Sequence, residues 1–374
     1  MKKRVLAIAL STIMAASLAA CGGSKPAETT AAAAPAAAET TAAAAAAETT
    51  AAAAAAETTA AAADGAVDTS NAKYTINIGH INAENDSWHL AALDFKEQVE
   101  KNSNGQIKVE VYPNSQLGPE VDMIQSILQQ GGCDITFTGE SMQTYSPDLG
   151  MIGMPYLIQS DEHMKAVLDG EVGKKLEGLM EEAGMKVLGY FTRGPRYITS
   201  NREIHSVADC QNLLIRTPQS PMTVAAFNAI GAKPTPMALS EVFTSLQSGT
   251  IEAQENPLAM ITTQSFYEVQ KYLIKTAHLR AWVYIAMGKA QFDALPADLQ
   301  QVVLDAGKHA QDYEHELFLK NEAEFEKTLQ EKGMTFIDVD TKEFADAMIN
   351  GVLPTLTDSQ KALYDEIAAA NPNK

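Results

Sequence analysis

From Tyr74 onward, strand patterns and helix patterns alternate along the chain, and this alternation limits the fold more than any other feature of the sequence. Residues 74–79 and 106–112 alternate apolar and polar side chains with the period of a strand. Between them, residues 87–102 place large apolar side chains at helical spacing. Strands that alternate with helices predict an α/β protein built in layers.

The same alternation continues toward the C-terminus. Because the segment that follows the N-terminal region holds roughly 300 residues, it exceeds the usual size of one hydrophobic core and predicts two lobes. The later patterns predict strands at 133–139, 186–191, 213–216 and 251–255, and helices at 120–130, 162–183, 222–230, 240–248, from Leu258, and from Pro296 to about Lys332.

Two segments repeat the order helix, glycine, strand. Residues 128–134 align with residues 246–252, and each strand soon reaches polar side chains, at Glu140 in the first case and Asn256 in the second. Ligands of open α/β sheets bind beyond the carboxyl ends of strands, so two such ends would form a cleft. The alternative is that the repeat reflects a common local pattern without functional meaning.

The first 20 residues have the pattern of an export signal. A basic start precedes an apolar run at 5–20, which is too short for a comfortable membrane span, and small residues precede Cys21. This pattern resembles the lipobox of bacterial lipoproteins, which predicts cleavage before Cys21 and acylation of its thiol. An ordinary secretory signal is the alternative. We expect a protein outside the cytoplasm, lipid-anchored to the cell membrane, in the periplasm or on the outer face of the cytoplasmic membrane.

Residues 21–72 predict a tether between lipid and globule. Glu-Thr-Thr recurs there between runs of alanine. The segment lacks the large apolar side chains that a core requires, and its composition is typical of a spacer. An O-glycosylated stalk is the alternative.

The charge balance excludes some classes of partner. The chain has 28 Lys and Arg against 47 Asp and Glu, a formal net charge of −19. Phosphate contacts need clustered cations, so we expect no nucleic acid partner. Cys133 and Cys210 are interpreted as buried or half-buried thiols, with a disulfide between them as the alternative in an exported protein.

The sequence offers little catalytic chemistry. It contains neither a Gly-x-Ser-x-Gly elbow nor a His-Glu-x-x-His pair, and its seven histidines are scattered, so we expect no catalytic residue, no metal and no cofactor. Arginines near strand ends are more informative. Arg216 terminates an apolar strand and Arg196 follows Gly-Pro, and a guanidinium there can bind a carboxylate through two hydrogen bonds. For either arginine alone, a surface ion pair is the alternative.

Several further motifs stand out along the chain, namely Pro113–Gly118, Leu213–Pro218, Gly231–Met237, Ser240–Val242, Gln254–Leu258 and Phe266–Tyr272. Together they resemble the solute-binding proteins of TRAP transporters. The resemblance covers residues 73–332, and within the family residues 137–141 and 199–202 resemble the sialic-acid receptors.

This resemblance implies an α/β fold of two lobes, similar to periplasmic binding proteins, with strands that cross between the lobes and a long helix that spans both. The expected lobe I is 73–193 plus 282–321, and lobe II is 194–281 plus 322–374. Hinges are expected near 193–196 and 278–282.

The resemblance also implies a set of ligand-binding residues. Arg216 matches the carboxylate-clamping arginine and Asn256 the residue that supports it. Arg196, Glu140, His80 and Asn82 match further positions around the cleft. Two residues depart from the sialic-acid receptors, since Gln143 replaces an arginine and Gln219 an asparagine. Without the cation at 143, a different organic acid is favoured over sialic acid.

We therefore expect an extracytoplasmic, monomeric lipoprotein that binds a small carboxylate and delivers it to an ion-driven TRAP permease. C4-dicarboxylates, sugar acids and keto acids all remain candidate ligands. One alternative is a ligand-sensing receptor for a signalling partner, which a neighbouring permease gene would argue against. Another is an exported hydrolase, which would turn its ligand over.

Overall fold

The computed structural model describes residues 67–373. The predicted signal peptide, Cys21 and the tether as far as residue 66 lie outside the described residues. Within the described part, no helix combines the length and apolarity that a bilayer crossing requires.

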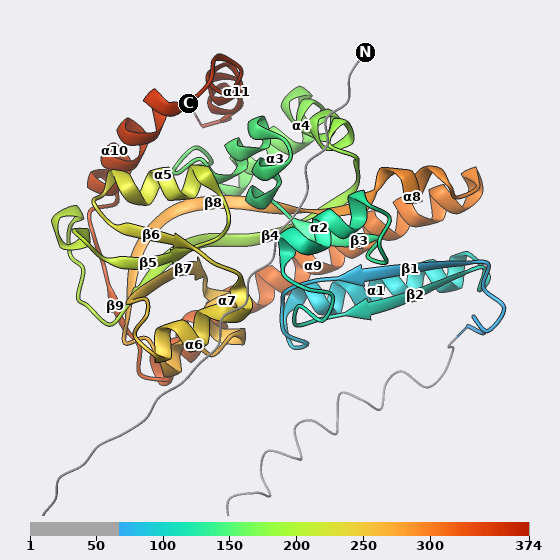
Figure 1. The fold of residues 1–374 in the computed structure, drawn as a ribbon, viewed down its shortest axis with the longest axis horizontal. Coiled ribbons are helices and arrows are strands. Elements are labelled where there is room, and N and C mark those ends of the chain that lie inside the picture. Colours follow the sequence, from blue (N-terminus) through green and yellow to red (C-terminus); the bar gives the residue numbers. More distant parts are fainter. Residues whose placement is uncertain (1–66, 374) are drawn as a thin grey trace, which may run out of the picture. The chain divides into compact units, whose positions relative to one another are not determined.

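One mixed sheet forms the centre of the described chain. Its strands lie in the order β2-β1-β3-β8-β4-β7-β5-β6, and β9 pairs with β8 (Figure 1). The strands are β1 (Tyr74–Gly79), β2 (Ile107–Tyr112), β3 (Ile135–Thr138), β4 (Met185–Ser200), β5 (Leu214–Thr217), β6 (Lys233–Pro236), β7 (Ala253–Pro257), β8 (Tyr272–Gly288) and β9 (Thr335–Ile337).

Helices cover the sheet and connect its strands. The α-helices are α1 (Ser87–Asn102), α2 (Glu120–Leu128), α3 (Asp161–Asp169), α4 (Glu171–Glu182), α5 (Pro221–Ala229), α6 (Val242–Gln247), α7 (Leu258–Thr263), α8 (Lys289–Asp293), α9 (Ala297–Glu331), α10 (Thr341–Val352) and α11 (Asp358–Ala369). The short 3₁₀ segments include η1 (Glu140–Thr144) and η2 (Pro147–Gly153).

The long strands β4 and β8 run antiparallel across the centre of the sheet (Figure 1). At one end, β8 pairs with β3, which continues into the parallel strands β1 and β2. At the other end, β4 pairs with β7, which continues into the parallel strands β5 and β6. The two halves therefore have matching topology. The sequence repeat at 128–134 and 246–252 leads into β3 and β7, which hold equivalent places in the two halves.

A β-bulge interrupts β4 at the predicted hinge. Thr192 pairs with Trp282 and Pro195 with Arg280, so Arg193 and Gly194 together oppose one residue of β8. Gly194 has φ +67°, a conformation that favours glycine. Residues three apart on a regular strand face opposite sides, but the extra residue reverses the alternation. Arg193 and Arg196 consequently face the same cavity.

The long helix α9 joins two apolar cores. Its Val303 belongs to the core formed by β1–β3 and α1, whereas its Leu329 belongs to the core around α6, α7 and the start of β8. A third core combines α2–α4 with α5, α10 and α11. The expected crossing strands and long spanning helix are therefore present.

The lobe boundaries stay predictions, and α11 complicates one of them. Although α11 lies in the stretch assigned to lobe II, Glu366 pairs with Lys175 of α4, and the carbonyl of Ile367 lies 2.8 Å from Nε2 of His163 in α3. Both partners belong to the predicted lobe I.

Three details differ from the sequence-based expectations. The helix predicted at 162–183 is two helices, because the chain turns at Gly170. The strand predicted at 186–191 extends through the bulge to Ser200. Cys133 and Cys210 are both buried free thiols, so the alternative of a disulfide between them is wrong.

Candidate functional site

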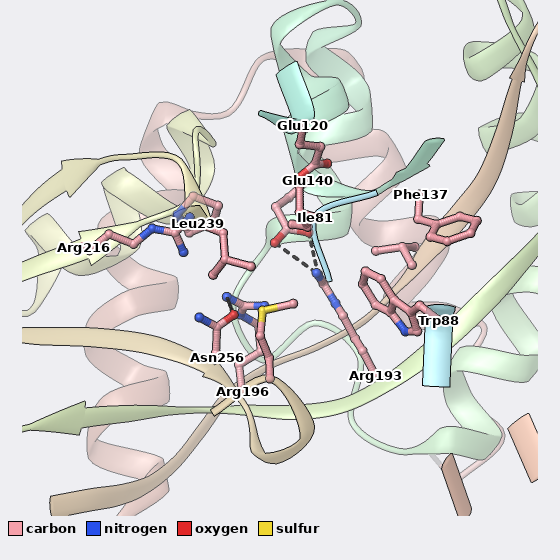
Figure 2. Close-up of a pocket in the computed structure, with 13 residues that line it drawn as sticks. Ile81, Trp88, Glu120, Phe137, Glu140, Arg193, Arg196, Arg216, Leu239 and Asn256 are labelled. Carbon is pink, nitrogen blue, oxygen red and sulfur yellow. Dashed lines mark hydrogen bonds and ion pairs between the residues drawn. The ribbon is translucent and has the colours of Figure 1, made fainter. Parts of the chain in front are cut away.

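A small cavity collects side chains from the middle of β4 and from the ends of β3, β5 and β7 (Figure 2). Apolar groups, among them Trp88, Phe137 and Leu239, form part of the wall. The rest of the wall is strongly polar, with three arginines and two glutamates converging on the same space.

Arg216 enters the cavity from β5 with its fork only partly used. Its Nε and Nη2 both donate to the carbonyl of Met237, at 2.9 and 2.7 Å. Among residues 67–373, its Nη1 has no hydrogen-bond partner and no carboxylate lies within ion-pair distance of the guanidinium. The side chain is only 4% exposed, and burial lowers the pKa of the Arg216 guanidinium to about 10. A buried cation without a counter-ion is costly, so the site suits an anion.

Arg196 is already paired with a carboxylate of the protein. Its Nε and Nη2 donate to the two carboxylate oxygens of Glu255 at 2.5 and 2.7 Å, and Nη2 also reaches Asn256 Oδ1 at 2.9 Å. Burial favours a higher pKa for Glu255, but Arg196 and His278 outweigh it and lower the pKa to about 2. Asn256 therefore contacts Arg196 rather than Arg216, the residue that the resemblance expected it to support.

Arg193 forms a second internal ion pair. Its Nη1 and Nη2 donate to the two carboxylate oxygens of Glu140 at 3.2 and 2.5 Å (Figure 2). Burial would raise the pKa of Glu140, but the charges of Arg193 and Arg196 outweigh burial and hold that pKa below its ordinary value. Glu140 is therefore a carboxylate at neutral pH. The Nε of Arg193 is buried without a hydrogen-bond partner among the described residues.

Glu120 contributes a carboxyl group whose pKa shifts in the opposite direction from that of Glu140. It begins α2, faces the cavity beside Glu140, and accepts a hydrogen bond of 2.7 Å from the hydroxyl of Thr138. Burial, followed by the charge of Glu140, raises the pKa of Glu120. A proton is thus held more tightly there than on an exposed glutamate, which favours hydrogen bonding to neutral groups.

Arg216, Arg196, Asn256 and Glu140 all line this cavity. Gln219 lines an adjoining recess, which shares Glu120 and Arg216 with the main cavity.

Gln143 does not line either space. Its Oε1 accepts hydrogen bonds from the backbone of Met222 at 2.9 Å and from Ser220 at 3.3 Å, so it ties η1 to the start of α5.

His80 and Asn82 lie behind the wall. The ring of His80 stacks on Phe137 with centroids 5.5 Å apart, and its Nε2 lies 3.1 Å from Nδ1 of His89. Burial and the nearby His89 lower the pKa of His80 to about 3, so its ring is neutral. Asn82 is buried, and its Oδ1 has no hydrogen-bond partner among residues 67–373. A direct role in ligand binding remains a prediction for both residues. In this structure the ring of His80 packs against Phe137, which lines the cavity.

Sequence reasoning missed Arg193, Glu255 and Glu120 as site residues. Glu255 directly precedes the predicted Asn256, and Arg193 precedes Gly194. A glycine inside a strand pattern signals a bulge, and that signal could have placed both arginines on one face. Within the described chain, no group of three or more His, Cys, Asp or Glu side chains is arranged to hold a metal ion.

Comparison with known proteins identifies the family. Residues 78–357 match the family model described as bacterial extracellular solute-binding protein, family 7. The chain belongs to this family. Its members and structural neighbours are binding proteins, and those neighbours are receptors of the TRAP type.

Three relatives show where the chain lies within family 7. A solute-binding protein of Roseobacter denitrificans is 41% identical over 78% of this chain and 90% of its own length. Its crystal structure, which contains bound L-galactonate, superposes with a TM-score of 0.77 and covers 79% of this chain and 99% of that one. The 2,3-diketo-L-gulonate-binding protein YiaO of Escherichia coli is 34% identical over 76% of this chain and 87% of its own. The sialic acid-binding protein SiaP of Vibrio cholerae is 28% identical, over 74% and 87%.

Proposed function

We propose that this family 7 protein is the extracytoplasmic receptor of a TRAP transporter, which captures a small organic acid and delivers it to an ion-driven membrane permease. The observation that carries the proposal is Arg216, a buried cation that lines the cavity and has no carboxylate partner in the described chain. A ligand carboxylate would supply the missing counter-ion through charge-assisted hydrogen bonds.

The ligand class that fits best is a sugar acid. Beyond Arg216, the wall offers hydrogen-bonding groups from Glu120, Glu140 and Asn256, which suit hydroxyl groups. The Roseobacter relative binds L-galactonate, and YiaO is named for 2,3-diketo-L-gulonate. Sialic acid fits less well, because Gln143 replaces the cation of the sialic-acid receptors and is engaged with α5.

Capture would proceed by closure of two lobes, 73–193 plus 282–321 and 194–281 plus 322–374. The bulge at Arg193 and Gly194 supplies the hinge on β4, and residues 278–282 supply it on β8. Binding stabilises the closed form because only that form gives the ligand contacts from both lobes. The protein performs no chemistry on its ligand and acts as a monomer.

The sequence of the N-terminal region supports the proposal that the protein is attached to the cell membrane. We propose that residues 1–20 are removed, that Cys21 is acylated, and that residues 21–72 hold the binding unit away from the lipid. The receptor then remains close to the permease while its cavity faces the surrounding medium.

Native mass spectrometry of the purified protein tests the proposal. We expect a co-purified organic acid, and titration calorimetry with that acid should give one site per chain. The recovered acid should be chemically unchanged after incubation, whereas conversion would support an exported hydrolase. Failure of every sugar acid, keto acid and dicarboxylate to bind would contradict the proposed function.

A further inference from the structure

The cavity holds three arginines, but the protein itself neutralises two of them. Arg196 is paired with Glu255 and Arg193 with Glu140, which leaves Arg216 without a counter-ion among the described residues. We propose that Glu140 sets the charge of the ligand by occupying the fork of Arg193, so that the cavity selects acids with a single carboxylate over their dicarboxylate counterparts. This inference rests on the proposed function and narrows its ligand class.

Glu140 binds Arg193 in the way that a carboxylate of a ligand would bind it. Each of its two oxygens accepts from a different terminal nitrogen of Arg193, which is the paired arrangement that a second ligand carboxylate would require. The two partners are also fixed in place. Glu140 is 4% exposed at the start of η1, and Arg193 projects from the bulge of β4.

A second ligand carboxylate would meet an unfavourable environment. To reach Arg193 it would have to displace Glu140, and it would then lie beside both Glu140 and Glu120. Burying a carboxylate without a free cation is costly, and nearby acidic groups add repulsion.

A hydroxyl group at the same place meets suitable partners. The oxygens of Glu120 and Glu140 can accept hydrogen bonds, and the buried Nε of Arg193 is a donor without a partner in the described chain. The arrangement therefore favours an acid with one carboxylate at Arg216 and a hydroxylated, uncharged far end.

Titration calorimetry on matched pairs of acids tests the inference. L-galactonate and galactarate share one carbon skeleton and differ only in the terminal group, a hydroxymethyl in the first and a carboxylate in the second. Gluconate with glucarate and glycerate with tartronate extend the comparison to other shapes. We expect the wild-type protein to bind the monocarboxylate of its best pair at least about tenfold more tightly than the dicarboxylate.

Two variants locate the cause. Glu140→Gln frees Arg193 and should move the affinity ratio of the best pair about tenfold or more toward the dicarboxylate. The double variant with Arg193→Gln should lose that gain, since no free cation remains beside the far end of the ligand. Glu366→Gln, which removes an exposed ion pair with Lys175 on α4, is the control and should leave the ratio unchanged.

The outcomes separate this inference from the proposed function. Wild-type protein that binds dicarboxylates as tightly as monocarboxylates would overturn the role of Glu140 while the receptor function stands. A folded Glu140→Gln protein with an unchanged ratio would do the same. If Glu140→Gln fails to fold, the ratio of monocarboxylate to dicarboxylate affinity in the wild-type protein decides whether the inference stands. Absence of binding for every acid would overturn the proposed function, and this inference with it.

Discussion

Replacing Arg216 should weaken ligand binding without lowering the stability of the ligand-free protein. Its Nε and Nη2 are held by the carbonyl of Met237, so Nη1 is the part of the fork left for a ligand. Arg216→Lys keeps the positive charge but loses the planar fork, and a lysine ammonium has no fixed geometry for binding Met237 and a carboxylate together. Arg216→Met removes the charge and retains much of the apolar volume.

The expected losses of affinity follow from burial of the ion pair. Removing one partner of a buried charged pair costs about 2–5 kcal/mol, mainly because the other charge remains unpaired. This range corresponds to a loss of roughly 30-fold to several thousandfold in affinity for Arg216→Met. Arg216→Lys should fall toward the lower end, because its ammonium still offsets part of the ligand charge.

The ligand-free protein should behave differently. Burial lowers the pKa of Arg216 from its ordinary value of 12.5 to about 10, which means that the folded state disfavours the charged form. At about 1.4 kcal/mol for each unit, this is a penalty of about 3 kcal/mol at neutral pH. Arg216→Met removes the penalty but leaves the Met237 carbonyl without its donors, at a cost of about 1–3 kcal/mol. The free energy of unfolding without ligand should therefore stay the same or rise.

Titration calorimetry and urea unfolding of the ligand-free proteins measure both effects. Arg202→Lys is the control, because Arg202 is about a third exposed and pairs with Glu252 on the surface. It should change neither quantity by much. Wild-type affinity in Arg216→Lys, or a large loss of ligand-free stability in Arg216→Met, would refute the reasoning.

Three further predictions concern other parts of the chain. Burial raises the pKa of Glu314 to about 8, so the free energy of unfolding should fall by a few kcal/mol as pH rises from about 4.5 to 8. Glu314→Gln should flatten that slope in urea titrations, and an equal slope in both proteins would contradict the assignment. Saturating ligand should reduce the radius of gyration in solution scattering, whereas an unchanged curve would indicate a static pocket. Cys21→Ser should release the protein from membranes or block its processing, and normal retention in membrane fractions would argue against lipidation.

Much of the fold could be predicted because local patterns decide it. The alternating residues of β1 and the apolar spacing of α1 gave the observed bounds of both elements. The β4 strand could not be predicted in full, because Gly194 and Pro195 are residues typical of turns. Here the long antiparallel partner β8 carries the strand through the bulge, which is a tertiary effect that no local pattern records.

The sequence predicted two of the arginines of the site, but it did not predict which carboxylate each arginine binds. Arg216 and Arg196 were found from their places at strand ends and from the family motifs. Which of the two has a free fork depends on Glu255, which reaches Arg196 because β7 lies next to β4. Strand adjacency of this kind arises between residues far apart in the chain. The same limit hid the pair between Arg193 and Glu140.

The pairing of β3 with the late strand β8 has a consequence for folding during synthesis. The half of the sheet that begins with β1 is completed only by β8, which starts about 200 residues later, so β3 lacks its second neighbour until residues 284–287 have been made. By contrast, the strands β4, β7, β5 and β6 of the other half all lie between residues 185 and 257, before β8 begins. The order of the strands would thus delay completion of the half that begins with β1, whereas the other half can pair its strands earlier.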